Sequence, residues 1–329
     1  DYGYSAAVLR RPPELTAETI YVVGGLYGNP EALEAVLALQ AREARGGAPV
    51  TLVFNGDFHW FDGAPHTFRQ VGDAVLGHVA LRGNVEAELA RGTGLDCGCA
   101  YPDYVEPGVV ARSNAIFARL AATAAGCTPQ RARLAALPLH RVASVGGRRI
   151  AILHGDPASL AGWRLAEEAL LGLEGRAGVA SPPGVPQTPL AQIEAWFREA
   201  DVDAFATTHT CLPFARDVRV DGRARLIVNN GSAGMPNFQG LRCGLLTRIS
   251  ALPEPPPESL YGIALEGVRY DAVPVPYDHE RWLRRFRADW PPGSPAHRSY
   301  HARIAEGPAY ALGQAVRGQV RLARSLRFA

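Results

Sequence analysis

Apolar and polar positions follow two successive patterns along this chain of 329 residues. Up to about residue 210, short apolar runs alternate with longer segments in which apolar residues recur every three or four positions. The short runs predict buried strands, at TIYVV (19–23), VTLVF (50–54), HVAL (78–81), RRIAIL (148–153) and DAFAT (203–207). The longer segments predict helices, at 30–43 with Pro30 in its first turn, at 110–137 with a break near Gly126, and at 188–200 opened by Thr188.

From residue 213 onward the pattern changes to consecutive strands. The runs lie at 214–220, 223–229, 244–250, 261–267 and 269–275. Alternation followed by strand after strand favours an α/β fold of two stacked mixed sheets flanked by helices. PEPPPE (253–258) predicts an exposed turn between late strands. We expect residues 1–275 to form one domain and the Arg- and aromatic-rich residues 276–329 to form an extension packed on it.

Polar segments follow the five strands of the first half. They are GGLYGN (24–29), NGDFHWFD (55–62), RGNVE (82–86), LHGD (153–156) and THTC (208–211). An open α/β sheet builds its site from side chains just beyond the carboxyl ends of its strands. Asp57, Asn84, His154 and His209 supply two imidazoles, a carboxylate and an amide oxygen. This donor set suits Mn, Fe(II) or Zn better than Mg or Ca.

These segments resemble the calcineurin-like metallophosphoesterase superfamily, whose motifs run D-x-H, G-D-x-x-D, G-N-[HCN]-[DE], H-G and G-H-T-H. The resemblance covers roughly residues 18–250, and GGLYGNPEALEAVL differs from the family's GDIHGNLEALEAVL mainly at two metal-binding positions. IVNNGSAGMPNF (227–238) is similar to the family's strand followed by N-P-G-S. The resemblance implies a four-layer α/β/β/α sandwich of two mixed sheets.

The resemblance also implies roles for particular residues. Asp57 matches the carboxylate that bridges two metals, and the other ligands of the second metal match Asn84, His154 and His209. Three ligands of the first metal are replaced, by Gly25, Tyr27 and Cys211. Because all three replacements fall on one metal, we expect one divalent transition metal (Mn, Fe or Zn) per chain. We expect the four remaining side chains to converge within one coordination sphere.

The function implied is hydrolysis of a phosphate ester by a metal-activated water at this altered site. Asp57 and Asn84 are then both metal ligands and catalytic residues. Arg82 either makes a bidentate contact with the phosphate or is a solvated or ion-paired arginine. A catalytically silent protein that binds a ligand or partner in the same cleft is the alternative. A third is a Cys- and metal-dependent activity unrelated to phosphate. Val85 stands where some family members carry a leaving-group-protonating histidine, which other members lack.

Two further residues are candidates to rebuild the lost half of the site. His59 lies two residues after Asp57, and it is either a replacement ligand or a loop residue stacked near Trp60 and Phe61. Cys211 is either a soft ligand that favours Zn or a small buried residue.

Three other motifs leave alternatives open. The Cys97/Cys99 pair is awkward as a disulfide, and is either a thiol site with Cys211 or a tight loop over the cleft. The NNGSAG segment (229–234) either cradles an anion with its N–H groups or is a glycine turn. Arginines recur at helical spacing near the C-terminus, which predicts a solvated face or, as a second choice, a subunit contact that would make a homo-oligomer. They are Arg317, Arg321, Arg324 and Arg327.

Composition narrows the class of protein. Hydrophobic residues make up 47% and charged residues 20%, as in an ordinary globular protein, and the net charge of +2 indicates neither nucleic acid nor a membrane surface as a partner. We expect a small phosphorylated substrate instead. No apolar run approaches the ~20 residues of a membrane span. Five cysteines do not make a disulfide framework in a chain of this length, and an odd count favours a reducing cytoplasm.

Overall fold

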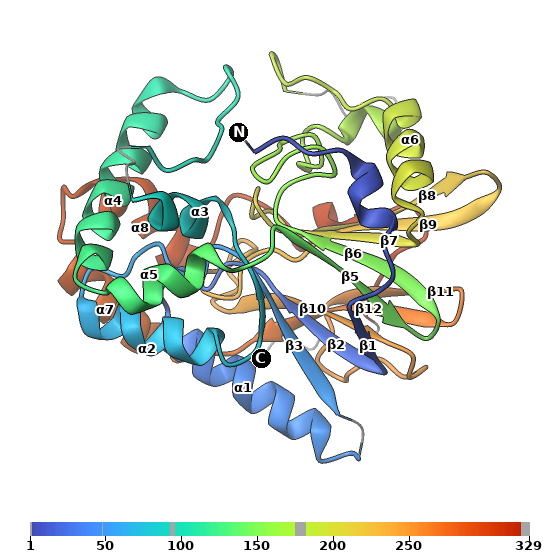
Figure 1. Ribbon diagram of the computed structural model, residues 1–329, viewed down its shortest axis with the longest axis horizontal. Coiled ribbons are helices and arrows are strands. Elements are labelled where there is room, and N and C mark those ends of the chain that lie inside the picture. The colour runs from blue at the N-terminus through green and yellow to red at the C-terminus, as the bar shows by residue number, and fades with distance from the viewer. Residues whose placement is uncertain (1, 48, 93–95, 175–181, 324–329) are drawn as a thin grey trace.

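A computed structural model describes residues 2–47, 49–92, 96–174 and 182–323 of the chain. Its strands form two mixed sheets of seven strands each within these residues (Figure 1). The first sheet has the order β1-β5-β6-β7-β9-β8-β13 and the second has the order β14-β11-β12-β10-β2-β3-β4. The predicted α/β fold of two mixed sheets flanked by helices is confirmed.

The first sheet consists of β1 (Leu15–Ala17), β5 (His140–Val145), β6 (Arg148–Leu153), β7 (Ala204–Thr207), β8 (Phe214–Val220), β9 (Arg223–Asn229) and β13 (Val316–Arg317). The second consists of β2 (Thr19–Val23), β3 (Val50–Asn55), β4 (Val79–Leu81), β10 (Gly244–Ser250), β11 (Tyr261–Leu265), β12 (Val268–Val275) and β14 (Arg321–Leu322). The α-helices are α1 (Pro30–Ala44), α2 (Pro65–Val75), α3 (Asn84–Arg91), α4 (Pro107–Ala125), α5 (Thr128–Ala135), α6 (Leu190–Ala200), α7 (His279–Asp289) and α8 (Pro295–Glu306). Short 3-10 turns lie at Ala6–Arg10, Leu171–Glu174 and Leu312–Ala315.

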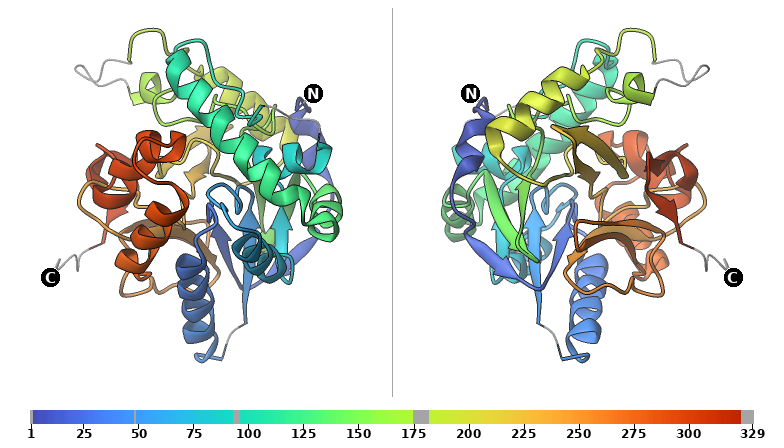
Figure 2. Two further views of the ribbon diagram at one scale, coloured as in Figure 1. Left: turned by 90° about the vertical axis from the view of Figure 1, so that its left-hand side faces the viewer. Right: turned by 90° about the vertical axis from the view of Figure 1, so that its right-hand side faces the viewer.

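Strand β2 illustrates how the layers form. Ile20 and Val22 belong to the core shared with the first sheet, whereas Tyr21 and Val23 pack among residues of α1, α2 and α7. Successive side chains of a strand point to opposite faces, so β2 buries one face against the other sheet and one against helices. The first sheet is covered in turn by α6 and the 3-10 turn Ala6–Arg10, which contact each other. The four layers are therefore helices, sheet, sheet and helices (Figures 1 and 2).

The parallel strands that carry the polar segments pair in register within their sheets. β2, β3 and β4 are parallel neighbours in the second sheet, and β6, β7 and β9 are parallel neighbours in the first. Their carboxyl ends therefore lie along one edge of each sheet, which brings five polar segments to one side of the sandwich. Several of the predicted helix and strand bounds differ from the observed ones by a few residues. In particular α6 begins after Pro189, and the Thr188 hydroxyl donates to the Arg164 carbonyl instead of capping the helix.

Helix α7, at the start of the expected extension, packs through an apolar face. Trp282, Phe286 and Trp290 are each about 1% exposed and belong to the core cluster around α1 and α2. Helix α7 contacts α1, and α8 contacts α4, as Figure 2 shows for the red helices beside the blue and green ones. Arg317 and Arg321 lie on strands β13 and β14, and not on a helix as their spacing suggested. Arg324 and Arg327 lie outside the described residues.

Within the described ranges, no helix combines the length and the hydropathy that crossing a bilayer requires.

Candidate metal centre

Four donor side chains meet where the strand ends converge. Asp57 follows β3, Asn84 begins α3 after β4, His154 follows β6, and His209 follows β7. Ligand atoms of Asp57, His154 and His209 all lie within 4.8 Å of one another. The Asn84 Oδ1 atom lies 3.1 Å from His154 Nε2, so the amide oxygen joins the same group. The expected convergence of the four side chains is therefore present.

The tautomers of the two imidazoles are set by backbone carbonyls. His154 Nδ1 lies 2.9 Å from the Asn55 carbonyl, and His209 Nε2 lies 3.1 Å from the Cys99 carbonyl. A carbonyl only accepts, so each of these nitrogens carries the proton, and the neutral rings keep their lone pairs on His154 Nε2 and His209 Nδ1. These two atoms face each other at 3.2 Å. Second-shell carbonyls of this kind orient the histidines of metal sites.

The amide of Asn84 is oriented in the same manner. Its Nδ2 group donates to the Cys97 carbonyl at 2.8 Å, which turns Oδ1 toward His154. Asp57 Oδ2 lies 3.3 Å from His154 Nε2. Two nitrogen lone pairs, one amide oxygen and one carboxylate thus point at a common space in a buried site. Such a donor set is suited to a divalent cation.

Protonation of the metal-free site follows from the same contacts. Burial alone would raise the pKa of Asp57, but the adjacent His154 outweighs burial and lowers it below its ordinary value. Burial opposes protonation of His154, yet the Asp57 carboxylate raises its pKa. Burial and the neighbouring His154 lower the pKa of His209 to about 4. In the absence of a cation, a proton at this site therefore favours His154 over His209.

Tyr27 fills the space between Gly25 and Cys211, the other two positions at which the sequence resemblance implied a replaced metal ligand. A Cβ atom on Gly25 would lie 2.6, 2.8 and 3.0 Å from three atoms of the Tyr27 ring. The Tyr27 hydroxyl contacts the Cys211 thiol, which also donates to the His209 carbonyl at 3.2 Å. Tyr27 therefore lies against both of the other replacements, and its ring excludes a side chain at position 25. Burial raises the pKa of the Cys211 thiol, which works against a thiolate ligand.

His59 points away from the four donors. Its Nδ1 atom lies 2.5 Å from Asp62 Oδ2, and its ring stacks on Phe68 with centroids 3.9 Å apart. The Nε2 atom faces Gly72 of α2. The structure thus places His59 in the core between the β3 loop and α2, where its ring stacks on Phe68 and makes a tilted contact with Phe58, instead of lying against Trp60 and Phe61.

Arg82 also lies apart from the cleft. Burial lowers its pKa, and the titratable groups that act on it are Arg91 and Tyr2 and not the candidate metal ligands. Glu86, which sequence analysis did not single out, has a clear role in the same turn. Its carboxylate accepts from the backbone N–H groups of Asp57, His59 and Gly83, so one buried side chain fixes two of the site's loops together. The glutamate that ends the RGNVE segment is the sequence feature by which this role could have been predicted.

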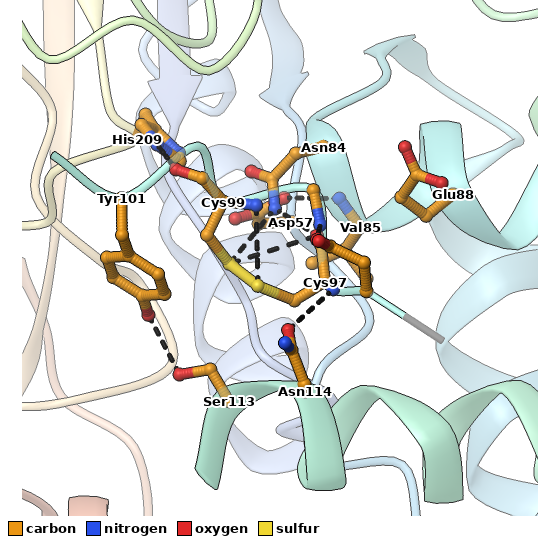
Figure 3. Close-up of a disulfide and its surroundings, with 12 residues drawn as sticks. Asp57, Asn84, Val85, Glu88, Cys97, Cys99, Tyr101, Ser113, Asn114 and His209 are labelled. Atoms are coloured by element: carbon orange, nitrogen blue, oxygen red, sulfur yellow. Dashed lines mark hydrogen bonds between the residues drawn. A yellow bond between two sulfur atoms is a disulfide. The ribbon is translucent and has the colours of Figure 1, made fainter. Parts of the chain in front are cut away.

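The loop that carries Cys97 and Cys99 covers the donors (Figure 3). Contrary to expectation, the two cysteines form a disulfide. Gly98 between them has a φ of +66°, and this left-handed turn brings their Cα atoms to 5.4 Å, which is within disulfide range. The carbonyls of this loop are the ones that orient Asn84 and His209, so the loop is a tight cover that positions two donors.

The NNGSAG segment is a turn whose N–H groups are used internally. Gly231 N–H donates to the Asn229 side chain, Ser232 N–H donates to Asn237, and Gly234 N–H donates to the Gly25 carbonyl. These groups are unavailable to an anion, so the interpretation as a glycine turn is the one that the structure supports.

A cavity of about 200 Å³ opens directly above Asp57 and His209. Sequence analysis missed most of its wall, which includes Trp163, Tyr300 and Arg303. Only their spatial proximity identifies them, because they come from the loop after β6 and from α8. A larger groove of about 860 Å³ lies elsewhere, between α6 and β13, and contains none of the four donors. The smaller cavity is therefore the relevant one for chemistry at the metal centre.

Comparisons with known proteins agree with this fold. No protein-family model matches the chain, and no curated protein does. Among solved structures, a hypothetical protein from Pyrococcus horikoshii OT3 superposes with a TM-score of 0.55 at 15% identity, over 90% of this chain and 100% of the other. A metallophosphoesterase from Sphaerobacter thermophilus superposes with a TM-score of 0.50 at 18% identity, over 89% and 100%.

These likenesses define the class of fold. The chain is a divergent protein with the metallophosphoesterase-like fold, in which a candidate site for a divalent cation is present at Asp57, His154 and His209. The matched share of the chain, 90%, exceeds the share made up by residues 1–275, so the structural likeness extends into the C-terminal extension.

Proposed function

We propose that this protein binds one divalent transition metal through Asp57, Asn84, His154 and His209, and that it hydrolyses a small phosphate ester there. One observation carries the proposal: two imidazole lone pairs are held 3.2 Å apart, facing each other, by carbonyl groups on the opposite ring nitrogens. When both rings are neutral, these two nitrogens are acceptors that repel each other, and a shared cation converts the repulsion into coordination.

The chain's own residues have distinct tasks in this proposal. His154 and His209 present neutral nitrogens, and Asn84 presents an oxygen that is oriented by the Cys97 carbonyl. Asp57 contributes the negative charge, and Glu86 holds its loop in place. When bound, a divalent cation lowers the pKa of a water molecule and polarises a phosphoryl oxygen. The aromatic wall above Asp57 and His209 limits the access of bulk water.

The lost half-site sets the expected rate. Tyr27 and Cys211 fill the place of a second cation, so its share of charge stabilisation is missing. That share is on the order of several kcal/mol, which corresponds to roughly a thousandfold slower hydrolysis. Activity should therefore be weak, and it should favour esters with good leaving groups, such as aryl phosphates.

The test combines metal loading with an assay. The purified protein is loaded with Mn, Fe(II) or Zn and given p-nitrophenyl phosphate and bis-(p-nitrophenyl) phosphate. We expect slow hydrolysis that requires the metal and disappears in Asp57→Asn and His209→Ala. His66→Ala is the matched control, because His66 is an exposed histidine outside the site and should leave the rate unchanged.

A catalytically silent, ligand-binding protein is the second candidate. The observation that favours it is the Tyr27 ring, which seals the space of the first metal with a fully buried side chain. A protein that takes up one metal but leaves both aryl esters intact would support this alternative against the proposed hydrolysis.

A further inference from the structure

The cavity above the metal donors has an aromatic wall. Trp60, Tyr101, Trp163 and Tyr300 all line it, together with Met235. Tyr101 and Trp163 pack against each other with centroids 5.6 Å apart, and Trp163 meets the His209 ring edge-on at 5.3 Å. These side chains come from four separate parts of the chain, so the aromatic character of the wall belongs to the folded cavity and not to one sequence segment. Such walls accept flat apolar groups.

The same cavity contains one side-chain cation, Arg303 of α8. Its guanidinium donates to the Cys211 carbonyl at 2.9 Å and to the Pro236 carbonyl at 3.4 Å. Across the described ranges, no carboxylate forms an ion pair with Arg303, whereas Arg281 and Arg285 of the preceding helix both pair with Glu31. The carbonyls fix the guanidinium in place but leave its charge without a neutralising partner. An arginine held in this way is suited to an anion.

The size of the cavity restricts the ligand. About 200 Å³ is less than the roughly 300–1,000 Å³ that drug-sized ligands occupy, so a nucleotide or a phosphopeptide side chain with its backbone would extend far beyond it. One phosphate group and one planar ring together are a better match. The metal donors Asp57 and His209 lie on the floor of the cavity, and Arg303 lies on its wall.

We propose that this cavity recognises a small aryl phosphate, with its ring packed against Tyr101 and Trp163 and one phosphate oxygen bound by Arg303. This inference rests on the proposed function, since it takes the same metal centre as the site of the phosphate. It adds the substrate class and assigns a binding role to the C-terminal extension. Arg303 is a binding residue for the anion, and Tyr101 is a specificity-determining residue for the ring.

The test measures binding without turnover. The full chain, loaded with Zn, is titrated with phenylphosphonate, which cannot be hydrolysed, and with methylphosphonate, while tryptophan fluorescence reports occupancy beside Trp60 and Trp163. We expect phenylphosphonate to bind roughly tenfold more tightly than methylphosphonate. Arg303→Met should weaken both ligands by roughly tenfold to a hundredfold, and Arg303→Lys should recover part of the loss.

Controls separate recognition from folding. Arg298→Met removes an exposed arginine of the same helix and should leave both Kd values unchanged. Tyr101→Leu should reduce the preference for the phenyl over the methyl ligand without abolishing phosphonate binding. If Arg303→Met does not fold, an unchanged preference in Tyr101→Leu would by itself contradict the proposed recognition of the ring. Equal affinity for the two phosphonates, or affinities insensitive to Arg303, would overturn the inference.

The outcomes also distinguish this inference from the proposed function. Arginine-dependent binding of phenylphosphonate without hydrolysis of any ester would support the cavity's ligand class and contradict the proposed hydrolysis. Metal-dependent hydrolysis that does not discriminate aryl from alkyl esters and ignores Arg303→Met would support the hydrolysis and contradict the ligand class.

Discussion

We predict that a single methyl group added at Gly25 destabilises the protein only while Tyr27 is present. The φ of Gly25 lies outside the left-handed region, so Gly25→Ala brings no backbone strain of that kind. The conflict is steric, because the new Cβ would lie 2.6–3.0 Å from the end of the Tyr27 ring. The ring can move only by leaving its contact with the Cys211 thiol.

The magnitude follows from packing. Overfilling a well-packed site costs about 1–3 kcal/mol. Once Tyr27→Ala has removed the ring, the same methyl group should be neutral, or stabilise by about 0.4–1 kcal/mol by restricting the unfolded chain. Tyr27→Ala alone should cost about 3–5 kcal/mol, as for other buried aromatic side chains. The two substitutions should therefore be coupled by about 1–4 kcal/mol.

Urea unfolding of the four proteins in this cycle, followed by tryptophan fluorescence, measures the coupling. Gly313→Ala is the matched control, since a Cβ there meets no atom within 4 Å, and its effect should be the same with and without Tyr27. If Gly25→Ala costs the same in both backgrounds, the ring does not occupy the space of the lost ligand, and the argument for a filled half-site is refuted.

Other predictions concern pH and the covering loop. Between pH 6.5 and about 4 the unfolded chain binds a proton that folded His209 refuses, so acidification should lower the free energy of unfolding of the metal-free protein by up to roughly 3 kcal/mol. The contribution of His154, whose pKa is raised, is complete below pH 6.5 and is lost as pH rises through its folded value. In urea unfolding of His209→Leu, the free energy of unfolding should therefore fall less steeply as the pH is lowered from 6.5 to about 4. The same dependence on pH in His209→Leu and the wild type would contradict a lowered pKa of His209. Replacing Cys97 and Cys99 together by Ser removes the disulfide that holds the loop whose carbonyls orient two donors, and it should lower metal affinity by roughly tenfold to a hundredfold in chelator competition. Cys127→Ser, at a cysteine outside the site, should have no such effect.

Much of the fold could be predicted from local pattern. β2, β3 and β6 are short, almost wholly apolar and bounded by turn residues, so their type and place are evident without tertiary information. The convergence of Asp57, Asn84, His154 and His209 followed from the rule that parallel strands end on one edge. β1 and β5 were not predicted, because β1 has only three residues and β5 mixes His, Arg and Ser with its apolar positions.

The remaining features depend on contacts between distant parts of the chain. The direction of the Arg82 and His59 side chains is decided by tertiary packing, for instance of His59 on Phe68. The Cys97–Cys99 bond depends on a left-handed turn at Gly98, which spacing alone does not reveal. Arg303 reaches the cavity from a helix almost 100 residues after His209, and no local motif marks it.

The central claim is that one half of a two-metal site remains and binds a single cation. Equilibrium dialysis against Zn or Mn, followed by elemental analysis, tests it most directly. We predict one metal per chain in the wild type and in His66→Ala, and none retained in Asp57→Ala or His209→Ala. Two metals per chain, or none in the wild type, would contradict the account.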